Sequence, residues 1–206
     1  MLEIFVKATF GVLAEITQET AKALYEFWAG PPVRYRDTIK LRHVATGGSL
    51  HSHALNYTHP GTSGQQQVTV FDGADNNDLW IVKGPNGQPE MYKEGLVIRQ
   101  GDVIRLEHLT TKRNLHSHNK PSPLTSQQEV TAFGENGAGD FNDNWRVEVL
   151  IGREWRENVN IRLIHVESEH ALHSHKGHKH PEYTADQQEV TAYKLRDDND
   201  LWRISK

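Results

Sequence analysis

Histidine pairs that could ligate a metal or contact a ligand recur three times along this chain. The tetrapeptide Leu-His-Ser-His stands at 50–53, 115–118 and 172–175, and another His lies eight residues before the first His of each copy. Alternation along an extended strand places the two His of a tetrapeptide on one face and the Ser on the other. Each copy therefore offers three imidazoles, the number of protein ligands in one type of catalytic zinc site. The three sets are His43, His51 and His53; His108, His116 and His118; and His165, His173 and His175.

A structural role for these histidines competes with metal binding and with ligand contact. An imidazole can hydrogen-bond to backbone groups across an irregular turn, and every unit of a repeat needs that turn. A framework must recur in every unit, whereas a working metal site has to occur only once. We therefore expect the histidines to be structural, and we predict neither a metal site nor any other cofactor.

A Gln-Gln-x-Val-Thr stretch follows each tetrapeptide, at 65–69, 127–131 and 187–191. A Gln side chain both donates and accepts, so it can satisfy backbone groups in a tight loop or hold a sugar hydroxyl. Recurrence again favours the structural role. The second Gln of each stretch is Gln66, Gln128 or Gln188.

A tryptophan in the last strand closes each unit. A buried indole supplies a large apolar area, so we expect these residues in the core, with sugar stacking as the alternative for one of them. The three are Trp80, Trp145 and Trp202. Polar residues beside them are expected to form Asx turns, at Asp78, Asn144 and Asp200.

The loops that follow the tetrapeptides differ between copies, which makes them better candidates for ligand binding than the recurring residues. They should occupy equivalent positions around a pseudo-threefold axis, and polar loops on a rigid scaffold are where binding usually sits. The third loop, rich in Lys and His, could attract an anionic group or a divalent metal, or could simply be solvated. The candidates are Asn56, Tyr57 and His59; Asn119 and Lys120; and Lys176, His178, Lys179 and His180.

Short alternating strands surround these features and predict an all-β fold. Residues 38–43 alternate polar and apolar side chains, and similar stretches open the other two units. Four short strands in each of three units give twelve, which is the pattern of a β-trefoil. A single unit could not bury its apolar face alone, and three open blades would be too few for a propeller. The repeats are expected at about 37–83, 101–150 and 158–206.

A stretch between the first two repeats, about 84–100, is predicted to form an inserted hairpin. It contains the pair Asn86-Gly87, a strong signal for a two-residue turn between antiparallel strands. The repeats and this hairpin together make one domain over residues 35–206.

Residues 1–34 differ in composition from the rest and predict a helical extension. Their apolar residues fall near helical spacing, and a Gly-Pro-Pro sequence ends the helix because proline cannot continue it. Thr17 or Thr20 is the expected N-cap. The helix could pack on its own domain, mediate dimerisation or docking through residues 1–30, or lie on a membrane surface. Its few basic residues weaken the last option.

Composition and charge exclude several classes of protein. The 206 residues suffice for one sizeable domain and an extension. A net charge of −4 argues against nucleic-acid binding, and the absence of cysteine excludes disulfides and Cys-ligated zinc. We find no signal peptide, retention signal or membrane span, which predicts a cytoplasmic location. No carboxylate pairing, phosphate loop or nucleophile elbow indicates catalysis, so no catalytic residue is predicted.

The repeated pattern resembles the MIR domain. The residues at 50–53, with Tyr57, Gly61 and the stretch at 65–69, are most similar to the branch of protein O-mannosyltransferases and stromal cell-derived factor-like proteins. Inositol trisphosphate and ryanodine receptors share the domain. The resemblance covers about 35–206 and implies a β-trefoil with a binding or regulatory role. It does not imply catalysis, because the mannosyltransferases carry out their reaction in a polytopic membrane domain with acidic catalytic residues.

Three hypotheses for the function follow. The first is a non-enzymatic MIR-type module that recognises a glycan or a protein partner through the loops after the tetrapeptides. The second is an accessory or regulatory subunit of a mannosyltransferase-like enzyme, or an adaptor that oligomerises through the N-terminal helix. The third, an enzyme with transferase or metal-dependent activity, has the least support in the sequence.

Overall fold

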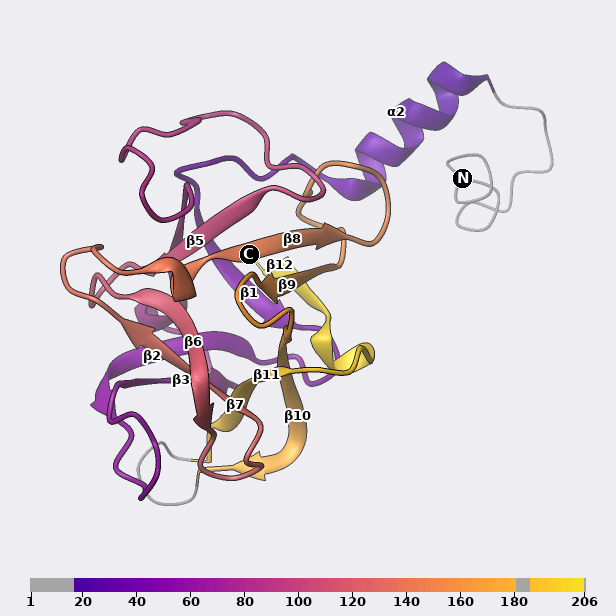
Figure 1. Ribbon diagram of the computed structural model, residues 1–206. Coiled ribbons are helices and arrows are strands. Elements are labelled where there is room, and N and C mark those ends of the chain that lie inside the picture. Colours follow the sequence, from indigo (N-terminus) through magenta and orange to yellow (C-terminus); the bar gives the residue numbers. More distant parts are fainter. Residues whose placement is uncertain (1–16, 181–185, 206) are drawn as a thin grey trace.

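Twelve antiparallel strands form a β-trefoil of three four-stranded units in the computed structural model, which describes residues 17–180 and 186–205 (Figure 1). The first unit contains β1 (Thr38–His43), β2 (Ser49–Asn56), β3 (Gln66–Phe71) and β4 (Trp80–Lys83). The second contains β5 (Val103–His108), β6 (Asn114–Pro121), β7 (Gln128–Phe133) and β8 (Trp145–Val149). The third contains β9 (Ile161–His165), β10 (Ala171–Lys179), β11 (Gln188–Tyr193) and β12 (Trp202–Ser205). A short 3-10 helix precedes the last strand of each unit: η1 (Asn76–Asp78), η2 (Phe141–Asp143) and η3 (Asp198–Asp200).

The strand pairing closes the molecule on itself. Outer strands of neighbouring units pair as β1–β12, β4–β5 and β8–β9, which forms a barrel. The hairpins β2–β3, β6–β7 and β10–β11 gather at one end, where β3, β7 and β11 pair with one another. Closure leaves no long unpaired edge that could recruit another chain. The predicted β-trefoil is therefore confirmed.

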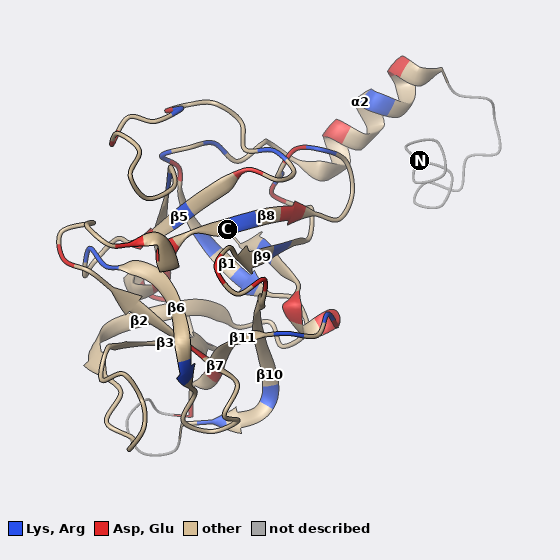
Figure 2. Cartoon of the chain, viewed as in Figure 1, with Lys and Arg blue, Asp and Glu red and all other residues tan. Residues whose placement is uncertain are grey.

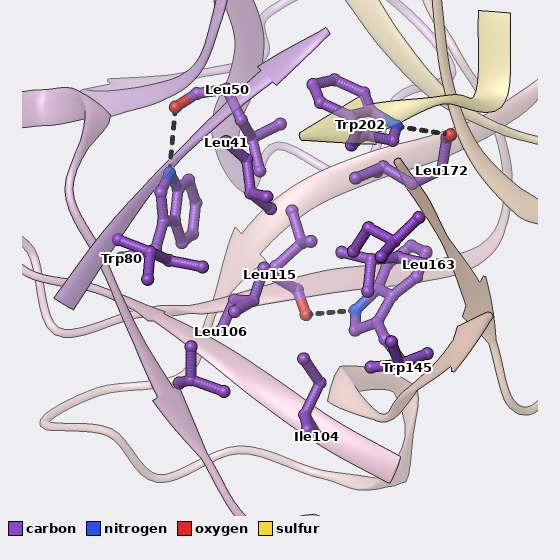
Figure 3. Close-up of a cluster of buried hydrophobic side chains, with 14 of the residues drawn as sticks. Leu41, Leu50, Trp80, Ile104, Leu106, Leu115, Trp145, Leu163, Leu172 and Trp202 are labelled. Carbon is purple, nitrogen blue, oxygen red and sulfur yellow. Dashed lines mark hydrogen bonds between the residues drawn. The ribbon is translucent and has the colours of Figure 1, made fainter. Parts of the chain in front are cut away.

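Three tryptophans fill the centre of the core. Trp80, Trp145 and Trp202 have no exposed surface and pack among leucines of all three units (Figure 3). Each indole N–H donates to the carbonyl of the Leu that opens the tetrapeptide of the same unit, at 2.9–3.0 Å. The same side chain therefore supplies apolar area and joins the fourth strand of a unit to its second.

Residues 84–100 do not form the predicted hairpin. They form consecutive turns with no strand pairing within the segment, although a turn is present at Asn86-Gly87. The two prolines in the segment lack the N–H that a strand ladder needs. The loop is held from outside instead, where Val97 forms an isolated bridge with Arg34.

The helix α2 (Gln18–Ala29) extends away from the barrel (Figure 1). Of the two expected N-caps, Thr17 is the one used, because its hydroxyl accepts the backbone N–H of Thr20. The helix ends at Gly30, whose φ of 72° suits glycine. Tyr25 attaches the helix to the barrel, since its hydroxyl donates to the Ile151 carbonyl at 2.9 Å.

Part of the predicted extension, residues 1–16, lies outside the described residues. Self-association or docking through residues 1–30 therefore stays a prediction. Among the described residues, no helix combines the length and the apolar character that crossing a membrane requires.

Replacing a core tryptophan by phenylalanine tests the indole hydrogen bond. Trp145→Phe leaves the Leu115 carbonyl without its donor and opens a cavity, so we expect the free energy of unfolding to fall by about 2–4 kcal/mol. Urea denaturation measures it. The half-buried Trp28 on α2 supplies the control, and Trp28→Phe should cost less than about 1 kcal/mol. Equal losses in both variants would contradict the assigned role of the bond.

Candidate binding site

The first histidine of each set lies buried at the junction of two units. Its Nε2–H donates at 2.8–3.0 Å to a backbone carbonyl in the 3-10 turn of the neighbouring unit. Its Nδ1 accepts a hydroxyl of its own unit at 2.8–2.9 Å. The ring also packs on the neighbouring unit's Trp, with centroids 4.9–5.2 Å apart. The carbonyls that receive His43, His108 and His165 belong to Asn199, Asn77 and Asn142.

Burial favours the neutral form of these three imidazoles. It lowers the pKa of His43, and it lowers the pKa of His108 and of His165 to about 4. A neutral ring also fits the hydrogen bonds, because Nδ1 must accept. Since both ring nitrogens are bonded to protein groups, the three histidines of a set do not converge on a single metal ion.

The second histidine of each set is paired with a buried aspartate. The Nδ1–H donates to a carboxylate oxygen at 2.8–2.9 Å, and the carboxylates have no exposed surface. The other oxygen of each carboxylate accepts a backbone N–H and so caps the 3-10 turn. The pairs are His51 with Asp78, His116 with Asp143, and His173 with Asp200.

The expectation of Asx turns at Asp78, Asn144 and Asp200 was wrong, because the side chains that accept an N–H two residues ahead are those of Asp75, Asp140 and Asp197. The counterpart of Asp78 and Asp200 in the second unit is Asp143 and not Asn144. An Asp stands two residues before every closing Trp, a signal that was present in the sequence. Asn144 instead accepts the backbone N–H of Asn86 at 2.8 Å, which helps to fix the 84–100 loop.

A second aspartate lies near each His–Asp pair. Asp75, Asp140 and Asp197 bring one carboxylate oxygen to 3.7 Å from the Nδ1 of His51, His116 and His173. Together with the pair, they place three possible metal-ligand atoms within 4.8 Å of one another in each unit. These aspartates already cap the 3-10 turns through their side chains. The clusters are therefore accounted for as parts of the framework.

The recurring glutamines also join neighbouring units. Gln66 Nε2 donates to Ser52 Oγ of its own unit at 2.7 Å and to Thr111 Oγ1 of the next at 2.9 Å. Gln128 makes the equivalent pair of bonds in the second unit, and Gln188 donates across to the first unit at 3.3 Å. These amides hold the framework together. Gln66 and Gln188 are buried, whereas Gln128 is half-buried and also lines a groove on the surface.

Two predicted loop candidates are buried instead of exposed. Tyr57 and His180 are only 4% and 7% exposed, because their N–H groups bond to Gln65 and Gln187 carbonyls and extend each hairpin by one pair. Their side chains then turn inward. The Tyr57 hydroxyl contacts the Val68 carbonyl at 3.2 Å, so this side chain belongs to the core of the hairpin end.

A ring of side-chain hydrogen bonds locks the three hairpins together. The first Gln of each Gln-Gln stretch accepts a Thr hydroxyl from another unit, at 2.5–2.6 Å. The pairs are Gln65 with Thr131, Gln127 with Thr191, and Gln187 with Thr69. The hairpin end is thus a rigid base for the loops above it.

The remaining loop candidates are exposed, and two of them line a groove on the surface. Asn56, His59, Lys176, His178 and Lys179 lie on the surface outside that groove. Asn119 and Lys120, at the end of β6, line a groove of about 440 Å³ between the second hairpin and the third unit.

Residues that sequence reasoning missed form the other wall of this groove. They are His170, from the turn before β10, and Tyr193 and Lys194, from the end of β11. The repeat pattern gave no reason to choose them, because they follow different strands from the candidate loops. Tyr193 is held in place by its ring contact with His173, with centroids 4.7 Å apart.

The closed barrel, the three linked hairpins and the groove define a β-trefoil domain whose framework recurs and whose surface does not. Residues 55–154 match the MIR domain family. A stromal cell-derived factor 2-like protein of Dictyostelium discoideum is 43% identical over 176 residues, which cover 84% of this chain and 82% of that protein. The chain belongs to the MIR-domain family, as the resemblance in its sequence predicted.

Two further comparisons place the chain within that family. The crystal structure of the SDF2-like protein from Arabidopsis thaliana superposes with a TM-score of 0.80 at 35% identity, covering 85% of this chain and 96% of that one. Protein O-mannosyl-transferase 2 of Drosophila pseudoobscura pseudoobscura is 38% identical over 191 residues, but these are only 25% of its length. The match to the transferase is therefore confined to one part of that protein.

The junction histidines predict a loss of stability in mild acid. Their folded-state pKa lies below that of the unfolded chain, so their contribution is complete above pH 6.5 and falls as the pH drops towards 4. Between pH 7.5 and 5.0, His108 and His165 should each cost about 2 kcal/mol of unfolding free energy. Urea denaturation at both pH values measures this loss.

A pair of variants separates the junction histidines from the others. His165→Gln should reduce the pH dependence by about 2 kcal/mol, since the unfolded chain then has one less proton to bind. The exposed His59 provides the control, because His59→Gln should leave the pH dependence as it is. An unchanged pH dependence in His165→Gln would show that burial at this junction does not hold the ring neutral.

Proposed function

We propose that this protein is a non-catalytic binding module that recognises a glycan in the groove beside the second hairpin. The observation that carries the proposal is the position of Asn119 and Lys120, which combine variation between repeats with a place in a groove. A binding module needs such a concave, polar surface on a rigid support.

The chemistry of the groove suits sugar hydroxyls. Asn119 presents an amide that can both donate and accept, and Tyr193 adds an aromatic ring. Gln127 adds a second amide, whose oxygen already accepts the Thr191 hydroxyl. The Gln–Thr ring beneath the groove reduces the entropy cost of binding because the hairpins are already fixed. Since Protein O-mannosyl-transferase 2 contains a similar module, mannose-containing glycans are the first to test.

The condition of the buried carboxylates supports a non-catalytic role. Asp78, Asp143 and Asp200 are committed to histidines and to turn capping. Glu129 and Glu189 are buried and accept backbone N–H groups from neighbouring hairpins. Within the described residues, the groove lining contains no Asp or Glu that could act as a general acid or base.

A glycan array with purified full-length protein tests this function. We expect binding to a defined set of glycans, weakened about tenfold by Asn119→Ala, which removes one or two hydrogen bonds. Lys176 occupies the same position after the tetrapeptide of the third unit but lies outside the groove, so Lys176→Ala serves as the matched control. An empty array with folded protein, or capture of a protein partner alone, would overturn the proposal.

A further inference from the structure

The groove beside the second hairpin carries positive charge on a chain with a net charge of −4. Lys120 and Lys194 reach it from two different units, and His170 adds an imidazole. Figure 2 shows basic residues at the free end of β6. No acidic side chain occurs among the described residues that line the groove, so nothing within it neutralises the two lysines.

The equivalent positions of the other units lack this set of charges. Strand register places Lys194 in correspondence with Asp72 and Gly134. Asp72 accepts a hydrogen bond from Gln188, so its carboxylate closes the corresponding surface of the first unit. The positive charge is therefore specific to the groove between the second and third units and does not belong to the repeated framework.

His170 supplies an unused hydrogen-bonding atom at this place. Its Nδ1 is buried and has no partner among the described residues. Burial lowers the pKa of His170, and the nearby Lys194 charge lowers it further. The other ring nitrogen donates to the Ala192 carbonyl, so Nδ1 carries a proton only when the ring is charged. A negative ligand group beside the ring would favour that charged form and offset the lysine charge.

We propose that the groove selects acidic glycans, with a sugar carboxylate held by Lys120 and Lys194 beside the ring of His170. The inference rests on the proposed function and names the ligand class of the same site. Charged lysines offer only donors, which match a carboxylate better than a neutral hydroxyl.

Titration calorimetry with two related disaccharides tests this selectivity. One ends in glucuronic acid and the other in glucose, so they differ in one carboxylate. We expect the acidic disaccharide to bind about tenfold more tightly at low salt, with the preference declining as salt is added. Lys194→Glu should abolish the preference, and Lys194→Arg should retain it. Lys22, on α2, provides the control with the same charge change, and Lys22→Glu should retain the preference.

Two outcomes are separable. Equal binding of both disaccharides would overturn the acidic selectivity and leave glycan binding intact. Binding of neither, with no hit on the glycan array, would overturn both proposals. NMR titration adds an independent readout, because a bound carboxylate should raise the pKa of His170.

A different observation concerns a chain of hydrogen bonds within the second unit. His116 Nδ1 bonds to Asp143 at 2.8 Å, His116 Nε2 to His118 Nδ1 at 3.1 Å, and His118 Nε2 to Glu129 at 2.8 Å. Both carboxylates are fully buried, and the His118 side chain is 17% exposed. Three consecutive bonds therefore link two acids through two imidazoles.

Two neutral imidazoles supply too few protons for these three hydrogen bonds. Each of the three bonds needs one proton, whereas two neutral imidazoles carry one N–H each and ionised carboxylates carry none. One additional proton must be present. Glu129 also accepts the backbone N–H of Ser63 at 3.2 Å, which favours its ionised form. Burial raises the pKa of Asp143, but this carboxylate accepts the backbone N–H of Asp140 at 2.9 Å in addition to His116, and both bonds favour its ionised form. The proton therefore belongs on an imidazole.

The His118 side chain is 17% exposed and that of His116 only 3%, so a charge costs less at His118. We infer that His118 is held as an imidazolium between His116 and Glu129. Asp140 and Asp143 face His116 from the η2 turn, at 3.7 and 2.8 Å from its Nδ1, and both favour positive charge in this pair. The neighbouring His165 ring, at the junction, would oppose a positive charge on His116 or His118 if it were itself charged. Burial keeps the His165 ring neutral.

The other units serve as internal comparisons. In the third unit, His173 bonds to Asp200 and to His175. These two hydrogen bonds need two protons, and two neutral imidazoles supply them. Glu189 accepts from the second hairpin instead of extending that chain. The first unit has Gln67 at the position of Glu129.

Nitrogen NMR of the imidazoles in the full chain at pH 7.5 tests the assignment. We expect both nitrogens of His118 to be protonated, with His175 neutral as the internal reference. In Glu129→Gln, the residue found in the first unit, the amide can donate to His118 Nε2 and the extra proton should be lost. Glu189→Gln, the matched control, should leave His118 charged. A neutral His118 in the unaltered protein would overturn the inference, whether or not the variants fold.

Discussion

The junction between consecutive units depends on an imidazole that is buried with both of its nitrogens in use. His108, for example, donates to the carbonyl of Asn77 in the first unit, accepts Thr111 in its own unit and packs on Trp80. A unit of four short strands cannot bury its own apolar face, so the fold exists only if three units close. The imidazole suits this position because one neutral side chain provides a donor, an acceptor and a flat ring.

The buried carboxylates extend the same arrangement within each unit. Asp78 bonds to His51 and caps the 3-10 turn that carries the Asn77 carbonyl. The His–Asp pair of the first unit and the hydrogen bond from His108 of the second unit therefore depend on the same turn. Burying a charged group is costly unless the charge is paired. Here each buried carboxylate accepts hydrogen bonds from several donors. The residues that most resemble catalytic or metal-binding groups are therefore the ones most firmly committed to structure.

Differences between units then have a clear physical meaning. The framework leaves the loops and strand ends free to vary, and Lys194 stands where another unit has Asp72. Glu129 and Gln67 occupy equivalent places with different proton requirements, although both are buried. A threefold scaffold can in this way vary its surface and its buried polar groups from unit to unit while the barrel still closes.

The sequence by itself determined the β-trefoil, the end of helix α2 at Gly30 and the family, because these follow from patterns that recur or from local turn chemistry. It did not reveal that Tyr57 and His180 are buried, since one extra hairpin pair decides which way these side chains point. The 84–100 loop was predicted as a hairpin because Asn86-Gly87 signals a turn, whereas strand pairing needs partners that the local sequence does not provide. Only the tertiary structure brought Lys120 together with His170 and Lys194, because the groove forms between two units and repetition reports only what each unit contains.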